Sequence, residues 1–257
     1  MLTLKSSFAS CSSSAMTIYT SPYPSVEVRN ESVFTHQFRT HFNDFPSDKA
    51  AFIDAATGFT ITRGQLKDYG LSMAWGLRHE LPRLGGVQLN RGDVIMIFSP
   101  NSIAWPVMFY GGIAAGLRMT LANSAYTPRE IRHQWVDSGA KAMFVHSTLV
   151  DVALEMFKTL DLDYTEALRR IIVVDWPTPP PASTNNLIRF SDLLGKGQLQ
   201  EEEKFDGELA NETVLLCYSS GTTGNPKGVM VRATRSRSSF YSKANVTNRR
   251  PIEISSR

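Results

Sequence analysis

The residues of this chain best suited to bind a ligand lie at positions 218–228, which read Y-S-S-G-T-T-G-N-P-K-G. Positions 219–227 hold four hydroxyl groups, two glycines and one ammonium group. Glycine lets a backbone approach a ligand closely, and successive N–H groups that point the same way form a concave anion site. Hydroxyls add donors, and lysine adds a compact positive charge. A polar turn without a ligand is the plainer alternative, but this residue order fits a polyphosphate better.

The elements around this loop distinguish between kinds of phosphate loop. Residues 214–218 are apolar and predict a buried strand. Pro226 lacks a backbone N–H and Asn-Pro favours a turn, so we expect a second strand, not a helix, after the loop. A Walker A loop needs a second glycine five residues after its first, then Lys and Ser or Thr. Here Pro226 stands five residues after Gly221, and Gly228 follows Lys227, which disfavours a P-loop nucleotide hydrolase.

Upstream of the loop, the hydrophobic pattern predicts strands alternating with helices. Thr62 and Thr127 each precede Gln or Glu by three positions, which is the capping-box signature of a helix start. Gly139 is placed to end the second of these helices. A-A-T-G at 55–58 predicts a hairpin between short strands at 51–54 and 59–61. We expect strands at 94–98, 142–145 and 171–174, and helices near 33–42, at 63–81, 103–116, 128–138 and 149–159.

This alternation predicts an α/β fold in layers, with a mostly parallel sheet flanked by helices. Residues 200–208 are acidic and predict a solvent-exposed connector.

Other polar or aromatic candidates have structural interpretations. We expect Asp175, at a strand end, to be solvated or capping and His133 to be a surface or packed imidazole. The tryptophans at helical positions, namely Trp75, Trp105 and Trp135, are expected in the core or along a groove.

The chain has 257 residues and a net charge of +3, but the basic excess is local. Seven of its 27 basic residues and one of its 24 acidic residues lie in 231–257, which leaves −3 on residues 1–230. A mildly acidic body argues against a nucleic-acid partner.

Two cysteines, Cys11 and Cys217, provide no disulfide framework and suit a reducing compartment. Five scattered histidines predict no metal site.

Segment 94–117 is free of charge, but S-P-N-S at 99–102 and Pro106 interrupt it. It therefore predicts a buried strand followed by a buried helix, and we expect no transmembrane segment. Residues 1–15 lack both the apolar run of a secretory signal and the arginines of a transit peptide, and they predict a disordered leader. These features favour a cytoplasmic protein.

The loop resembles the signature phosphate loop of the AMP-binding, adenylate-forming superfamily, which includes acyl-CoA synthetases, the adenylation domains of peptide synthetases and luciferase. The resemblance covers about residues 16–231 and is strongest to the 4-coumarate–CoA ligase-like branch. It rests on T-S-P-Y-P at 20–24, A-F-I-D-A-A-T-G at 51–58, T-x-x-Q-L at 62–66, R-G-D-V-I-M-I-F-S-P-N-S at 91–102 and A-N-S-A-Y-T-P-R-E-I at 122–131.

The resemblance implies an ATP-dependent acid–CoA ligase. A carboxylate and Mg²⁺-bound ATP would form an acyl-adenylate, and coenzyme A would then displace AMP to give a thioester. The fold implied is the N-terminal part of the large domain of such enzymes, incomplete here. In that reading Lys227 neutralises the β- and γ-phosphates, which are also contacted by Ser219, Ser220, Gly221, Thr222, Thr223 and Gly224.

After Val231 the resemblance ends, and residues 232–257 predict a disordered, basic, Ser- and Arg-rich tail. We therefore divide the chain into a leader (1–15), a partial AMP-binding N-terminal domain (16–231) and this tail.

The family's acyl pocket, adenine-binding motifs, magnesium-binding Glu and catalytic Lys have no counterparts, so no catalytic residue is assigned. We expect a truncated product, inactive alone and weak in ATP binding, in which the one phosphate-loop strand left at the end of the chain lacks the sheet neighbours that would order it. A non-catalytic scaffold or binding protein is the alternative. The complete enzyme could be peroxisomal, although this C-terminus carries no such signal.

Overall fold

A computed structural model describes residues 31–38, 46–176, 186–205, 207–219 and 226–232. The main sheet in this part of the chain has seven strands: β3 (Val94–Phe98), β4 (Arg118–Ala122), β5 (Ala140–His146), β6 (Ile171–Val174), β7 (Ile188–Arg189), β8 (Thr213–Ser219) and β9 (Lys227–Arg232). Their order is β7-β6-β5-β3-β4-β8-β9, and every neighbouring pair is parallel except β8–β9. The expected α/β class with a mostly parallel sheet is confirmed.

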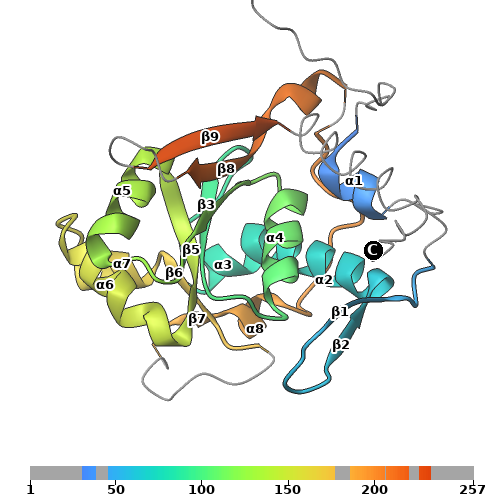
Figure 1. Cartoon of the computed structure of the whole chain (residues 1–257), viewed down its shortest axis with the longest axis horizontal. Helices are drawn as coiled ribbons and strands as arrows, with labels where there is room; N and C mark the ends of the chain where they lie inside the picture. The colour runs from blue at the N-terminus through green and yellow to red at the C-terminus, as the bar shows by residue number, and fades with distance from the viewer. Residues whose placement is uncertain (1–30, 39–45, 177–185, 206, 220–225, 233–257) are drawn as a thin grey trace, which may run out of the picture.

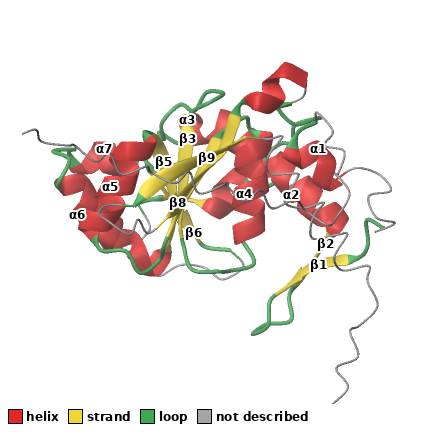
Figure 2. Ribbon diagram, turned by 45° about the horizontal axis from the view of Figure 1, so that its top comes forward, coloured by secondary structure: helices red, strands yellow, loops and turns green. Residues whose placement is uncertain are grey.

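Helices cover both faces of this sheet (Figures 1 and 2). One layer contains α1 (Val33–Phe38), α2 (Arg63–Trp75) and α4 (Trp105–Ala114), and the other contains α5 (Pro128–Ser138), α6 (Val150–Lys158) and α7 (Tyr164–Leu168). The remaining helical segments are a π-helix at Gly76–Glu80, α3 (Leu81–Arg83), α8 (Phe190–Leu193) and two 3₁₀ helices at Ser147–Leu149 and Gly207–Asn211.

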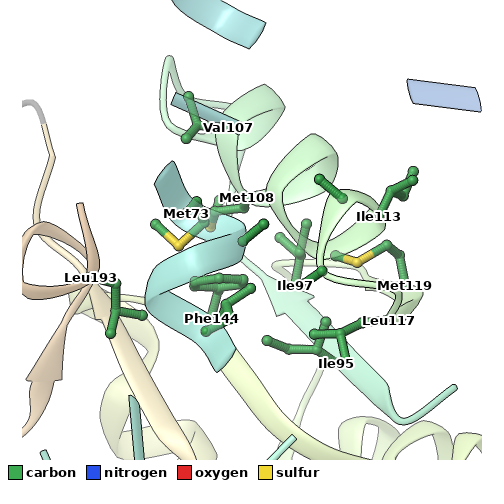
Figure 3. Close-up of a cluster of buried hydrophobic side chains, with 14 of the residues drawn as sticks. Met73, Ile95, Ile97, Val107, Met108, Ile113, Leu117, Met119, Phe144 and Leu193 are labelled. Atoms are coloured by element: carbon green, nitrogen blue, oxygen red, sulfur yellow. The ribbon is translucent and has the colours of Figure 1, made fainter. Parts of the chain in front are cut away.

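The central strand β3 is buried on both faces, as its uninterrupted apolar sequence requires. Ile95 and Ile97 belong to the core cluster on the α2–α4 side, which Figure 3 shows. Val94, Met96 and Phe98 belong to the second cluster, on the α5–α6 side. This alternation follows from the period of two in a strand. The charge-free segment 94–117 therefore folds as a buried strand and a helix, as expected.

The predicted helix boundaries are confirmed where the sequence carries capping signals. Thr62 with Gln65 and Thr127 with Glu130 each form a complete capping box. Gly139 ends α5 in the left-handed conformation, with φ of 66°, as a C-terminal glycine commonly does. The hairpin predicted before α2 is also present, as the antiparallel pair β1 (Ala50–Ile53) and β2 (Thr60–Thr62).

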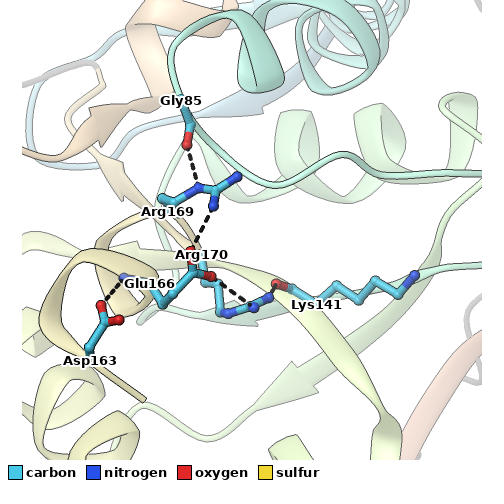
Figure 4. Close-up of polar contacts among 6 residues, drawn as sticks. All are labelled: Gly85, Lys141, Asp163, Glu166, Arg169 and Arg170. Carbon is cyan, nitrogen blue, oxygen red and sulfur yellow. Dashed lines mark hydrogen bonds and ion pairs between the residues drawn. The ribbon is translucent and has the colours of Figure 1, made fainter.

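Two short strands and two short α-helices were missed, namely β4, β7, α7 and α8, together with the 3₁₀ helices at Ser147–Leu149 and Gly207–Asn211. Each has few residues, so its local pattern is weak and packing against neighbours determines its structure. The helix α7 is fixed at its start by Asp163, whose carboxylate accepts from the Glu166 backbone N–H at 2.8 Å. At its other end Arg169 and Arg170 both donate to Glu166, as the dashed lines in Figure 4 show. Arg169 also donates to the carbonyl oxygen of Gly85, and Arg170 to that of Lys141.

The expectation of an exposed connector at 200–208 was wrong in part. Glu202 is buried, and Phe205 is fully buried in the core cluster on the α2–α4 side. Arg91 lies over the Phe205 ring, 4.4 Å from its centroid. Because this segment is rich in acidic residues, its sequence did not indicate that one apolar residue, Phe205, packs it against the domain. The predicted leader at 1–15 and all but the first residue of the predicted tail at 232–257 lie outside the described residues.

Candidate phosphate-binding hairpin

The candidate loop joins β8 to β9, two antiparallel strands at one end of the sheet (Figure 1). The strand that follows the loop confirms strand–loop–strand geometry, whereas a Walker A loop leads into a helix. β8 lies between β4 and β9, so the strand before the loop has two neighbours. The expectation that the last strand, after the loop, lacks sheet neighbours was wrong in part, because it has one. β9 pairs with β8 alone and forms the edge of the described sheet.

Two of the seven predicted ligand-binding residues lie in the described part of the chain. Ser219 and Lys227 are paired directly across the hairpin, and both are exposed. Their side chains are therefore accessible to a ligand at the end where the loop begins and ends. The other five predicted residues lie outside the described residues: Ser220, Gly221, Thr222, Thr223 and Gly224.

Tyr218 occupies the position just before the loop and is paired with Gly228. A Cβ atom added to Gly228 would lie 3.0 Å from Cζ of the Tyr218 ring, so glycine leaves room for this ring. The Tyr218 hydroxyl donates to Oδ2 of Asp137 on α5 at 2.5 Å. Burial and this bond to a carboxylate raise the pKa of Tyr218 far above its usual value, which keeps the hydroxyl protonated as a donor.

The other end of the loop also contacts α5. Nε2 of His133 lies 3.0 Å from the carbonyl oxygen of Pro226, the residue before Lys227. Since a carbonyl oxygen only accepts, this contact requires a proton on Nε2 of His133. The expectation of a packed imidazole is compatible with this position, because His133 is partly buried.

A hollow of about 740 Å³ lies beside the hairpin, between α5 and Pro226. Its lining combines bases and acids from α5 with Pro226 itself. The lining residues are Tyr126, Thr127, Arg129, Glu130, Arg132, His133, Val136, Asp137 and Pro226. No local sequence pattern indicates this arrangement, because Asp137 and Tyr218 are 81 positions apart.

The remaining polar and aromatic candidates are structural. Asp175 accepts from the backbone N–H of Ser191 at 2.9 Å and from its hydroxyl at 2.5 Å, so it fixes the start of α8 as a capping acid. Trp135 is buried against Phe157. Cys217 is partly buried, and this burial raises the pKa of its thiol.

Two kinds of feature are absent from residues 31–38, 46–176, 186–205, 207–219 and 226–232. Within these ranges no three His, Cys, Asp or Glu side chains group as a candidate metal site. No helix in the same ranges combines the length and the apolar character needed to cross a bilayer.

The described part of the chain is thus a mostly parallel sheet between helix layers that ends in an antiparallel strand–loop–strand hairpin. The sequence profile of the family described as "AMP-binding enzyme" matches residues 38–253. The chain belongs to this family. The match runs past Val231, where the resemblance was expected to end. The division of the chain into a domain at 16–231 and a tail at 232–257 stays a prediction.

Curated relatives in this family include plant and bacterial ligases. 4-Coumarate-CoA ligase 1 of Narcissus pseudonarcissus is 32% identical over 215 residues, which are 84% of this chain and 35% of that protein. 4-Coumarate–CoA ligase 3 of Arabidopsis thaliana is 31% identical over 214 residues, which are 83% of this chain and 34% of that protein. The chain thus spans about a third of the length of these relatives.

Solved structures show the same fold. A long-chain-fatty-acid-CoA ligase from Archaeoglobus fulgidus has a TM-score of 0.66 and 22% identity, over 89% of this chain and 42% of that one. A benzoate CoA ligase from Burkholderia xenovorans has a TM-score of 0.61 and 21% identity, over 83% of this chain and 36% of that one. O-Succinylbenzoate Coenzyme A Synthetase from Bacillus subtilis, solved with AMP, has a TM-score of 0.56 and 20% identity, over 79% of this chain and 44% of that one.

Proposed function

We propose that the loop at 218–228 binds the β- and γ-phosphates of ATP in an acid–CoA ligase reaction. The observation that supports this most is the pairing of Ser219 with Lys227 across the hairpin. That pairing places a hydroxyl donor and an ammonium group at the two ends of a loop rich in glycine and threonine. Hydroxyls, backbone N–H groups and an ammonium ion together suit the oxygens of a polyphosphate.

The proposed reaction has two steps. In the first, a carboxylate oxygen attacks the α-phosphorus of ATP, and the bond to the β-phosphate oxygen breaks to release pyrophosphate. In the second, the sulfur of coenzyme A attacks the acyl carbon, and AMP leaves. Donors placed around the β- and γ-phosphates stabilise the negative charge that develops on the departing pyrophosphate. Mg²⁺ is proposed to arrive bound to the ATP phosphates, as it commonly does.

The proposed donors are the residues predicted from the sequence. Lys227 supplies the positive charge, and backbone or hydroxyl donors come from Ser219, Ser220, Gly221, Thr222, Thr223 and Gly224. No residue of this chain is assigned to the carboxylic acid, to coenzyme A or to the acid–base chemistry.

We further propose that these 257 residues alone bind ATP weakly and do not complete the reaction. Val229 and Met230 on the edge strand β9 are 51% and 67% exposed, so little packing fixes the strand that carries Lys227. An edge strand with exposed apolar side chains also favours association with other chains. This chain spans about a third of the length of the relatives.

Titration of the chain with Mg²⁺–ATP by isothermal titration calorimetry tests the phosphate assignment. The Lys227→Ala variant should bind at least several-fold more weakly than the unaltered chain, because an ammonium–phosphate contact is lost. Lys158→Ala on α6 is the matched control, since Lys158 is exposed and pairs with Glu155, three positions earlier on the same helix. Equal ATP affinity of the Lys227→Ala variant and the unaltered chain would contradict the assignment.

An ATP–pyrophosphate exchange assay tests the second part of the proposal. The 257-residue chain should give no exchange above background with 4-coumarate, benzoate or a long-chain fatty acid. Robust exchange would show that these residues form a working adenylation site and would overturn this part.

A further inference from the structure

The helix α5 contacts both ends of the candidate phosphate loop. Asp137 accepts a hydrogen bond from Tyr218, immediately before the loop, at 2.5 Å. His133 lies 3.0 Å from the carbonyl oxygen of Pro226, at the other end. Residues four positions apart lie on the same face of a helix, so one turn of α5 faces both strands of the hairpin. Figure 1 shows α5 beside the end of β9 where the loop joins it.

The helix is well placed to act as a rigid support. It begins at the capping box of Thr127 and Glu130 and ends at Gly139. Its inner face is buried, with Ile131 fully covered and Trp135 packed against Phe157 of α6. Because both ends are capped and one face is packed in the core, the positions of His133 and Asp137 are fixed relative to the sheet.

The hairpin, in contrast, has little packing of its own near the loop. Ser219 and Lys227 are exposed, and β9 has β8 as its one neighbour in the described sheet. The bonds from α5 therefore provide fixed points at residues 218 and 226. Fixing both ends of a short loop reduces the conformational entropy that a ligand would otherwise have to remove.

We propose that His133 and Asp137 are positioning residues that hold Tyr218 and Pro226, on either side of the phosphate loop, in place for polyphosphate binding. They act through Pro226 and Tyr218 and do not touch the ligand. This inference rests on the proposed function of the loop, and it adds a role for α5 that neither the loop sequence nor its spacing indicates.

Hydrogen–deuterium exchange of the backbone amides of Tyr218, Ser219, Lys227 and Gly228, the strand pairs that flank the loop, is the first test, measured on the full 257-residue chain without ligand. His133→Ala and Asp137→Ala should each increase the exchange rate of these amides several-fold. His133→Gln keeps a donor and Asp137→Asn keeps an acceptor, so each should restore much of the protection. Val136→Ala, at an exposed neighbouring position on α5, is the matched control and should leave the loop unchanged.

Mg²⁺–ATP affinity of the same variants is the second test. The two alanine variants should bind about 5- to 20-fold more weakly, and the glutamine and asparagine variants should recover most of that loss. Unchanged loop exchange in both alanine variants would overturn the inference, whatever their ATP affinity. If the unaltered chain binds no ATP but the alanine variants loosen the loop, the positioning stands and the proposed function fails.

The Tyr218→Phe variant keeps the test decisive if an alanine variant fails to fold. It removes one hydroxyl while α5 stays intact, and it should loosen the loop as Asp137→Ala does. Combining it with Asp137→Ala should add little further exchange beyond either single change, because both changes remove the same bond. Additive effects of the two changes would show that Asp137 does not act through Tyr218.

Discussion

The side-chain amide of Gln134 donates to the hydroxyl oxygen of Thr120 at 2.8 Å, which joins α5 to β4 inside the protein. The same Nε2 donates to the carbonyl oxygen of Leu121 at 3.0 Å. The Thr120 hydroxyl in turn lies 3.4 Å from the carbonyl oxygen of Leu216 on β8. Gln134 is 1% exposed and Thr120 is fully buried. This polar chain therefore fixes α5 relative to the strand that leads into the loop.

Replacing Gln134 by Met should lower the free energy of unfolding by about 1–3 kcal/mol, because buried acceptors on β4 lose their donor. The double change Gln134→Met with Thr120→Val should cost less than the sum of the single changes, since both partners become apolar. Urea unfolding of the three variants measures this. Strictly additive losses would show that the two side chains are not coupled.

Gly76 is required where the helical segment after α2 passes α8. A Cβ atom at position 76 would lie 2.1 Å from the carbonyl oxygen of Leu193. Gly76→Ala should lower stability by about 1–3 kcal/mol through overpacking, despite the gain of about 1 kcal/mol in helix propensity. Lys67→Ala on the exposed side of α2 is the control and should change stability by less than about 0.5 kcal/mol. A stabilised Gly76→Ala variant would contradict this packing.

Gly139 tests backbone strain separately from packing. Its φ is 66°, and a Cβ atom there would have no neighbour within 4 Å. Gly139→Ala should therefore cost about 1–2 kcal/mol from the left-handed conformation alone. Gly139→Asn should cost less, because Asn tolerates this conformation better. Thermal unfolding of both variants gives the comparison, and equal losses would indicate that α5 ends differently.

Tyr110 on α4 should make the protein less stable at high pH. Burial raises the pKa of Tyr110 to about 12, whereas an unfolded chain releases this proton at about pH 10. Between these values the folded state keeps a proton that the unfolded state has lost, so the free energy of unfolding falls as pH rises. The fall attributable to Tyr110 is up to roughly 3 kcal/mol, and below about pH 10 there is none.

Urea unfolding from pH 9 to 12 checks this expectation. Tyr110→Phe should show a shallower loss of stability over this range than the unaltered chain. Tyr164→Phe is the control, because Tyr164 is 61% exposed on α7, and its profile should follow that of the unaltered chain. Identical profiles for all three proteins would contradict the role of Tyr110.

The sequence by itself determined the family, the class of fold and the position of the loop. Capping boxes at Thr127 and Thr62, the left-handed glycine at 139 and the apolar strand at 94–98 are local signals, and each specifies the structure of its own segment. Lys227 could be selected in the same way, because residue type and order within one loop are enough to indicate phosphate chemistry.

Tertiary structure alone decided which residues support that loop. Asp137 and Tyr218 are 81 positions apart, and His133 and Pro226 are 93 apart, so no local pattern connects them. They meet because β4 places β8 in the sheet while α5 packs across the same end, and this follows from burial over the whole domain. Short elements such as β4 were missed for the same reason, since their stability comes from their neighbours rather than from their own sequence.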